Sequence, residues 1–179
     1  MRQILILLSF LLLISCGNSK KPSVETVEFK KYSSVLEALK AANDFSVENG
    51  TLKVLSKEGE PIHIQVSKPI FEGDLEDVII QQTKRDVVYV AFQAFAETDI
   101  NELTVTSIPV KDKSNYVDKY KMTVTVNRVT AKNILKKYLA TESFQDLYKL
   151  EGTLYLPSAR FDKLKFADLD KVFSDLSNR

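Results

Sequence analysis

Residues 74–97 read DLEDVIIQQTKRDVVYVAFQAFAE, and the conformation of this stretch decides the fold. Its first part, from Leu75 to Gln82, carries apolar residues at helical spacing. Residues 87–96 are apolar throughout except for one glutamine, and their β-branched and aromatic side chains favour a buried strand. Three alanines and the lack of any glycine or proline favour a continuous helix instead. We expect one long helix, buried over its second half and packed across a sheet; a helix followed by a strand is the alternative.

Upstream of this stretch, the sequence predicts three short antiparallel strands. Asn49-Gly50 is typical of a two-residue hairpin turn, so residues 45–48 should pair with residues 51–54. A second turn leads to a strand at 62–66, and a three-residue loop there keeps one face of the sheet apolar, whereas a two-residue loop does not. The expected pairs are Val47 with Leu52, Phe45 with Val54, Val54 with Ile64 and Leu52 with Val66.

The remaining elements are expected on both sides of this region. Ser34 and Glu37 have the spacing of a capping box at the start of a first helix over 34–43. Downstream, alternating patterns predict strands, and 3.6-residue patterns predict helices. The expected elements are strands at 103–108 and 120–127, a helix at 130–139 capped by Thr130, a short helix at 143–149, an extended segment at 152–156 and a helix at 167–176.

The order of these elements predicts the fold class. Strands fall in groups of three and two, with a helix between the groups and helices after them, and a wholly parallel sheet would require strict alternation. We therefore expect an α+β fold, with an antiparallel sheet of about five strands and helices packed on one face. Residues 32–179 are long enough for one such domain.

The N-terminal sixteen residues follow a different pattern. Residues 1–3 carry one positive charge, and residues 4–14 are an apolar run too short to span a bilayer. The run ends in Leu13-Ile14-Ser15-Cys16, and Cys16 is the only cysteine of the chain. This segment resembles the signal of bacterial lipoproteins, in which cleavage precedes the cysteine, the sulfur receives a diacylglycerol and the new amine is usually acylated. An ordinary secretory signal or membrane anchor, with an incidental cysteine, is the alternative.

The resemblance implies that residues 1–15 are a signal peptide and that Cys16 is the lipidated first residue of the mature protein. Residues 16–31 are polar and are expected to form a flexible tether. Because Gly17 is not the aspartate that retains enterobacterial lipoproteins in the inner membrane, the resemblance favours the periplasmic side of the outer membrane. Removal of Arg2 leaves 24 Lys+Arg against 24 Asp+Glu, a balance that offers no electrostatic basis for binding nucleic acid.

No combination of residues points to catalysis, to a metal ion or to a cofactor. His63 is the only histidine and Cys16 the only cysteine, so a zinc site cannot be assembled, and His63 is expected on the solvated face of its strand. No glycine-rich phosphate loop is present. The acidic residues at 72–77 allow a calcium site, but their spacing does not match the calcium-loop pattern, and complementation of a helix dipole is expected instead.

Two functions remain, and neither is enzymatic. We expect a membrane-anchored envelope lipoprotein with a binding, accessory or inhibitory role toward a protein partner. The alternative is a lipoprotein that binds a lipid or small apolar ligand in a pocket between sheet and helices. A deep apolar pocket would favour the second function and a closed core the first. The aromatic residues that could line such a pocket are Tyr89, Phe92, Phe95, Tyr120, Tyr138, Phe144 and Tyr148.

Overall fold

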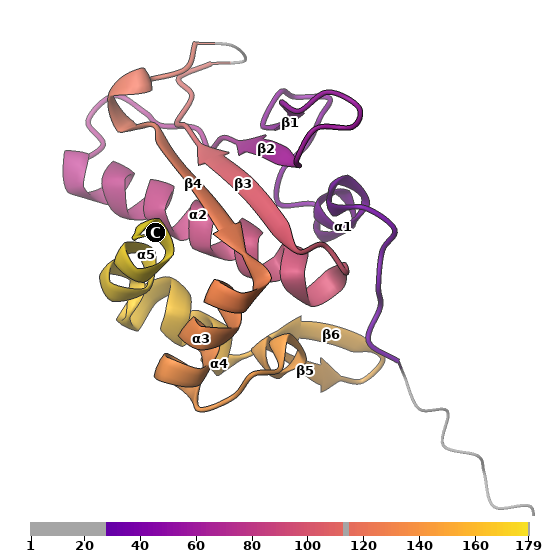
Figure 1. The fold of residues 1–179 in the computed structure, drawn as a ribbon. Helices are drawn as coiled ribbons and strands as arrows, with labels where there is room; N and C mark the ends of the chain where they lie inside the picture. Colours follow the sequence, from indigo (N-terminus) through magenta and orange to yellow (C-terminus); the bar gives the residue numbers. More distant parts are fainter. Residues whose placement is uncertain (1–27, 113–114, 179) are drawn as a thin grey trace, which may run out of the picture.

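The computed structural model describes residues 28–112 and 115–178 (Figure 1). The predicted signal peptide, Cys16 and most of the predicted tether lie outside the described residues. The buried apolar residues of the described chain run from Val35 to Leu176, and most of them belong to a single cluster. The core is therefore built from residues of the predicted domain itself.

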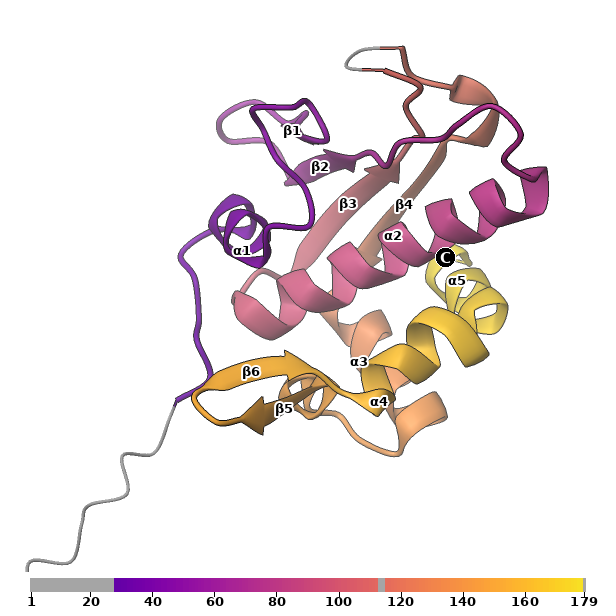
Figure 2. The same cartoon turned by 180° about the vertical axis from the view of Figure 1, so that it is seen from behind.

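The central element is α2 (Glu76–Glu97), a single helix of 22 residues, which confirms the prediction of one long helix. Residues 87–96, where a strand was the alternative, are all buried except the half-buried Tyr89. No residue in this stretch breaks a helix, and its apolar side chains find neighbours on several sides. Figure 2 shows α2 running across the molecule with other elements above and below it.

The α+β class is confirmed, but the prediction of a five-stranded antiparallel sheet is wrong. The main sheet is mixed and has four strands in the order β1 (Leu52–Val54), β2 (His63–Val66), β3 (Glu102–Ser107) and β4 (Met122–Asn127). β2 and β3 run parallel, whereas the β1–β2 and β3–β4 pairs are antiparallel. The reason is α2 itself, about 33 Å long, which carries the chain back along the sheet so that β3 starts at the same end as β2.

The two predicted turns before α2 have different outcomes. The three-residue loop is confirmed, because Leu52 pairs with Val66 and Val54 with Ile64. The hairpin at Asn49-Gly50 is wrong, because residues 45–48 form no strand and the pairs Val47–Leu52 and Phe45–Val54 do not exist. A two-residue hairpin turn of this kind needs positive φ at both central residues, and only Gly50 has it, at 76°.

The side chain of Asn49 explains this difference. Its Oδ1 accepts hydrogen bonds from the backbone N–H of Thr51 at 3.0 Å and from the Thr51 hydroxyl at 2.7 Å. The chain therefore turns within a wider loop, closed by the Leu52 N–H donating to the Ser46 carbonyl at 2.9 Å. Phe45 is then free to enter the core, where it is buried.

The helices outside α2 follow the predicted pattern with three corrections. α1 (Val35–Ala42) begins at the predicted cap Ser34, and α5 (Leu169–Ser177) matches the last predicted helix. α3 (Arg128–Leu139) starts earlier than expected, because Asn127 rather than Thr130 is the cap and accepts from the Thr130 N–H. The helix predicted at 143–149 is only the 3-10 turn η2 (Phe144–Leu147), and the sequence did not indicate η1 (Asp118–Tyr120), α4 (Ala159–Asp162) or the π-helix η3 (Lys163–Ala167).

A second, two-stranded sheet was also missed. β5 (Tyr148–Glu151) and β6 (Leu154–Pro157) form an antiparallel hairpin apart from the main sheet. The predicted extended segment at 152–156 is thus the turn and most of β6. The first half of its partner β5 fell within the helix predicted at 143–149, and the second half was given no element. Figure 1 shows this hairpin below α2, beside the point where the described chain begins.

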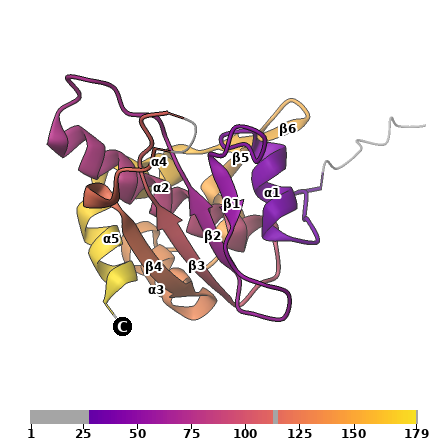
Figure 3. The ribbon, with the colours of Figure 1, turned by 90° about the horizontal axis from the view of Figure 1, so that it is seen from above.

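The main sheet has one apolar and one polar face. Ile64, Val105 and Val124 lie in register on the buried face, against α2. On the other face, His63 Nε2 lies 2.9 Å from Thr106 Oγ1, and no helix stands in front of β3 and β4 (Figure 1). The predicted polar placement of His63, alongside Gln65, is confirmed. Seen from above, α1 and α5 lie at opposite edges of the sheet (Figure 3).

Arg128 closes the C-terminal end of α2. Its guanidinium donates to the carbonyls of Phe95 at 2.9 Å, Thr98 at 2.7 Å and Ile100 at 2.8 Å. It also lies over the rings of Phe95 and Phe144, at 5.2 and 5.3 Å from their centroids. A helix end leaves carbonyls without intrahelical partners, and a cation there also complements the helix dipole.

Replacement of Arg128 should therefore destabilise the fold strongly. We expect Arg128→Met to lower the free energy of unfolding by about 2–4 kcal/mol, because three carbonyls lose a charged donor. Arg128→Lys should recover only part of this, since one ammonium cannot reproduce the fork of the guanidinium. Urea unfolding followed by circular dichroism measures the effect. Arg160→Met is the control, because Arg160 forms only an exposed pair with Asp146; an equal loss in both variants would contradict the role of Arg128.

Candidate functional site

A groove runs along the side of α2 that faces away from the sheet, and we call it the α2 groove. Its floor is a stripe of residues four apart, Arg85, Tyr89, Gln93 and Glu97, which a helix places in one row. α1 and the residues that follow it form one wall, and β6 forms the other (Figure 2). The groove holds two cavities, of about 620 and 280 Å³, which adjoin because both are lined by Asp44, Tyr89 and Pro157.

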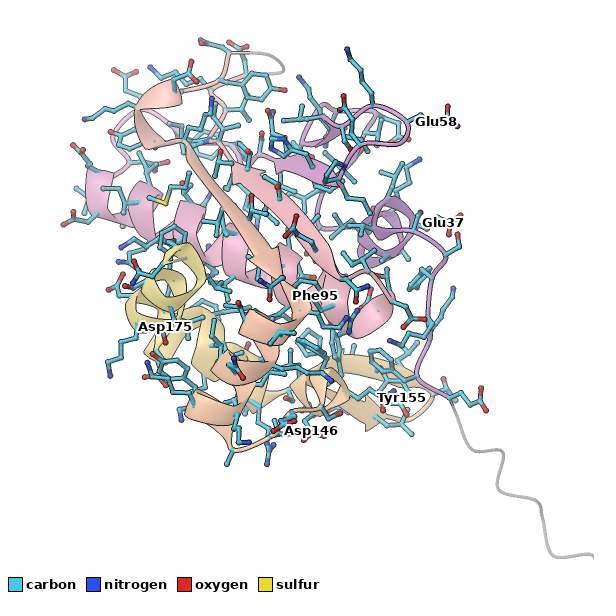
Figure 4. The ribbon with its side chains drawn as sticks, viewed as in Figure 1. Glu37, Glu58, Phe95, Asp146, Tyr155 and Asp175 are labelled. Carbon is cyan, nitrogen blue, oxygen red and sulfur yellow. The ribbon has the colours of Figure 1, made fainter. Side chains whose placement is uncertain are left out.

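The larger cavity, which we call the aromatic cavity, has walls rich in aromatic rings. Phe29 lies with its ring centroid 5.1 Å from that of Tyr148 and 5.0 Å from that of Tyr155. Figure 4 shows Tyr155 on β6, beside the first described residues of the chain. Tyr32 donates its backbone N–H to the Glu97 carbonyl at 2.8 Å. Tyr32, the first residue of the predicted domain, is thus bonded to the C-terminal end of α2, and Phe29, near the end of the predicted tether, packs on the hairpin and helps to form this cavity.

Polar groups at the base of the aromatic cavity are buried and incompletely paired. Gln93 is 2% exposed and donates through Nε2 to Glu97 at 3.2 Å, while its Oε1 has no partner among the described residues. The Tyr148 hydroxyl lies near the Glu97 carboxylate without meeting the geometry of a hydrogen bond. Burial raises the pKa of Glu97, and the Gln93 and Tyr148 side chains and Lys31 partly oppose this effect.

Tyr89 stands between the two cavities. Its hydroxyl donates a hydrogen bond to the Asp44 carboxylate. Burial raises the pKa of Tyr89, and the neighbouring carboxylates of Asp44, Glu97 and Asp86 add to the effect. The phenol therefore remains a neutral donor, and Asp44 is held by it at the junction of the cavities.

The smaller cavity, which we call the cationic cavity, is lined by Lys68, Arg85 and Lys165 against only two acids, Asp44 and Asp86. The Lys68 ammonium lies 3.6 Å from Asp86, which is 2% exposed. Burial raises the pKa of Asp86 from its ordinary value of 3.8 to about 6, although Lys68 and Arg85 oppose this. The positive charges of the lining therefore outnumber the negative ones, most clearly at mildly acidic pH.

All three cations lie over aromatic rings, Lys68 with its ammonium 5.4 Å from the centroid of Phe45. The Lys165 ammonium lies 4.5 Å from the centroid of Phe161 and 5.3 Å from that of Tyr89. The Arg85 guanidinium lies 5.4 Å from the centroid of Phe166, a ring carried by the same π-helix as Lys165. Such contacts fix the direction of a cation without neutralising its charge.

The structure brings together few of the residues that the sequence singled out. Cys16 lies outside the described residues, and His63 sits on the sheet face opposite α2. Of the aromatic candidates, Tyr89 and Tyr148 line the groove, Phe92, Phe95 and Phe144 belong to the core, and Tyr120 and Tyr138 lie elsewhere. The acidic residues at 72–77 do not converge on a metal position, since Glu76 pairs with Lys119 and Asp74 caps the Phe71 N–H.

The groove itself was missed by the sequence reasoning. A signal was present, because Arg85, Tyr89, Gln93 and Glu97 recur every four positions in a stretch whose other residues are all apolar except Asp86. Lys68 and Lys165 gave no comparable signal. Within residues 28–112 and 115–178, no group of three or more histidine, cysteine or acidic side chains is placed to hold a metal ion.

Comparison of the chain with protein-family models, curated proteins and solved structures finds no match. Among the helices of the described residues, none is both long enough and apolar enough to cross a bilayer. Function must therefore be inferred from the geometry of the α2 groove.

The buried carboxyl of Asp86 should leave a signature in the pH dependence of stability. Because its folded pKa of about 6 exceeds the ordinary 3.8, the folded protein binds this proton more tightly than the unfolded chain, and the group costs stability as pH rises from about 4 to about 6. We expect Asp86→Asn to be more stable than the parent at pH 7, by on the order of 2 kcal/mol, and similar to it at pH 4. Urea unfolding at several pH values measures this.

Asp170→Asn is the matched control for this experiment. Hydrogen bonds from Lys84 and Gln81 lower the pKa of Asp170, so the exposed carboxylate stabilises the fold above its ordinary pKa and loses that effect as pH falls. Asp170→Asn should therefore lower the free energy of unfolding slightly at pH 7, whereas Asp86→Asn should raise it. An Asp86→Asn protein that is less stable than the parent at pH 7 would mean that the Lys68 pair outweighs the cost of burial.

Proposed function

We propose that this protein is a lipid-anchored, non-enzymatic binding protein of the bacterial envelope, and that the α2 groove is its ligand site. The observation that carries the proposal is the aromatic cavity. Its volume of about 620 Å³ falls within the usual range of small-molecule sites, and its walls combine aromatic rings with a few buried polar groups. Such a lining favours a small organic ligand with an apolar part.

The unpaired polar atoms beside this cavity support the same conclusion. A buried donor or acceptor without a partner costs roughly 1–3 kcal/mol. Among the described residues Gln93 Oε1 is such an atom, and the Tyr148 hydroxyl, which lies near the Glu97 carboxylate without a well-formed hydrogen bond, is a second; both belong to residues that line the cavity. A polar group of a ligand, or an ordered water, would relieve this cost.

The position of the groove fits attachment to a membrane. The resemblance of Leu13–Cys16 to a lipoprotein signal supports lipidation of Cys16, with the outer membrane facing the periplasm favoured by Gly17. Cys16 and Glu28 are twelve residues apart, a separation of at most about 40 Å. Because Glu28, Phe29, Lys30 and Tyr32 line the aromatic cavity, the proposed site lies at the end of the domain nearest the anchor.

A protein partner is the second candidate, and a different surface favours it. Phe71, Leu75 and Val78 are 70%, 71% and 56% exposed at the start of α2. Figures 1 and 2 both show this end of α2 on the side of the domain away from the first described residues. Exposed apolar residues that gather in one place mark protein contacts. This surface becomes the stronger candidate if the aromatic cavity takes no ligand.

Lipidation is tested by changing the proposed acceptor. We expect Cys16→Ser to leave the chain unprocessed or to release it from membranes, because the sulfur that carries the diacylglycerol is gone. Membrane fractionation shows the location, and mass spectrometry of the N-terminal peptide of the parent protein shows the modification. An unmodified Cys16 in membrane-bound protein would overturn the lipoprotein assignment.

Ligand binding is tested with a neutral fluorescent probe, N-phenyl-1-naphthylamine. Residues 16–179 carrying Cys16→Ser should bind it with increased fluorescence. Ala41→Phe, which adds a ring to the wall of the aromatic cavity, should weaken this binding at least tenfold. Ala159→Phe is the matched control, since Ala159 is also an exposed helical alanine but does not line the cavity. Absence of binding, or equal binding by both variants, would contradict the proposed site.

A further inference from the structure

We propose that the cationic cavity binds the anionic group of an amphipathic ligand whose apolar part lies in the aromatic cavity. This inference rests on the proposed function for the aromatic cavity and adds the chemical class of the ligand, a carboxylate or phosphate carried on a hydrocarbon body.

The first argument is the incomplete pairing of two of the three cations, Arg85 and Lys68. The side chain of Arg85 makes no hydrogen bond or ion pair with another residue of the described chain; its guanidinium stacks on Phe166 and acts on Asp86 only at longer range. Lys68 has Asp86 as its one acidic partner, and burial disfavours the ionised form of that carboxyl. A bound anion would therefore find donors that are not already committed to strong partners.

The second argument is the burial and fixed position of the Lys165 side chain. This residue is 9% exposed, which is unusual for a lysine, and its ammonium pairs at 3.2 Å with Asp162, whose side chain is 54% exposed. It is carried by the π-helix η3, a rare conformation that recurs at functional sites. The ammonium of Lys165 lies over the rings of Tyr89 and Phe161, so it is held at the cavity before any ligand arrives.

The third argument is the distribution of charge along the groove. Lys68, Arg85 and Lys165 face Asp44 and Asp86 at one end, where cations are in excess. At the other end Glu28 and Glu97 face the single cation Lys30, so acids are in excess there. An anionic group is attracted to the first end and repelled from the second, so this distribution fixes the orientation of the ligand. The apolar body then extends past Tyr89 toward Phe29 and Tyr155.

The dimensions allow one molecule to occupy both cavities. They adjoin at Asp44, Tyr89 and Pro157, and the rise along α2 from Arg85 to Gln93 is about 12 Å. An octyl chain with a head group has a similar length, which makes octanoate and octyl phosphate suitable probes.

The test is isothermal titration calorimetry on residues 16–179 carrying Cys16→Ser, in buffer without detergent or lipid. Octanoate and octyl phosphate should bind, and the tighter of the two identifies the favoured head group. Octanol, which lacks the charge, should bind at least tenfold more weakly, and octylammonium more weakly still. Inorganic phosphate, which lacks the apolar body, should also bind at least tenfold more weakly than octyl phosphate.

Arg85→Gln locates the head group. It should weaken octanoate binding about tenfold or more, as expected for loss of a hydrogen bond to a charged group, and leave octanol unchanged. Arg160→Gln is the matched control and should change neither, because Arg160 lies outside both cavities. Urea unfolding of each variant confirms that its fold is retained.

Four results would overturn the inference. They are no binding of either anion, octanol binding as tight as octanoate, unaltered octanoate binding by folded Arg85→Gln protein, and inorganic phosphate binding as tight as octyl phosphate. None of these results bears on the proposed function, which is tested separately by binding of the neutral probe and by the Ala41→Phe variant. The experiments therefore distinguish an incorrect ligand class from an incorrect binding site.

Discussion

The burial of α2 is the constraint on which the rest of the structure depends. A helix of 22 residues that is buried over its second half must have apolar neighbours on several sides, and its last carbonyls must find donors other than water. The sheet supplies one neighbour, while α1, α5 and the residues around Phe144 and Phe161 supply others. Arg128 supplies the donors. Because it begins α3 directly after β4, the same residue ties the end of α2 to the second half of the fold.

The α2 groove follows from this arrangement. The neighbours of α2 leave a groove along one side of the helix, and the stripe of Arg85, Tyr89, Gln93 and Glu97 forms its floor. Polar residues on a largely buried helix cost stability, and Gln93 is the clearest case, because its Oε1 is both buried and unpaired. Apolar residues at these positions would extend the core. Sites where a sequence departs from the packing rules in this way are commonly functional ones.

The sequence predicted those parts of the fold that depend on local patterns. The long helix followed from the absence of breakers, and the pairing of Leu52 with Val66 followed from the need for one apolar face. The errors arose where distant contacts decide: β3 is parallel to β2 because α2 reverses the chain between them, and Asn49 forms a side-chain turn with Thr51 in place of a hairpin. The groove was predictable in part, since its floor is a four-residue repeat, whereas Lys68 and Lys165 reach it only through the tertiary fold.

The charge of the groove also shows why overall composition is a poor guide to local chemistry. The predicted mature chain is neutral, and that balance excludes an electrostatic case for large polyanions such as nucleic acid, which need an extended positive surface. A small anion has no such need, because three cations around a cavity of about 280 Å³ act at short range and in surroundings of reduced dielectric. Below about pH 6, burial strengthens this local field further, because Asp86 is then mostly neutral. Neutrality of the whole chain and a positive site within it are therefore compatible, and the site is defined by the elements that surround α2 rather than by the number of charges in the sequence.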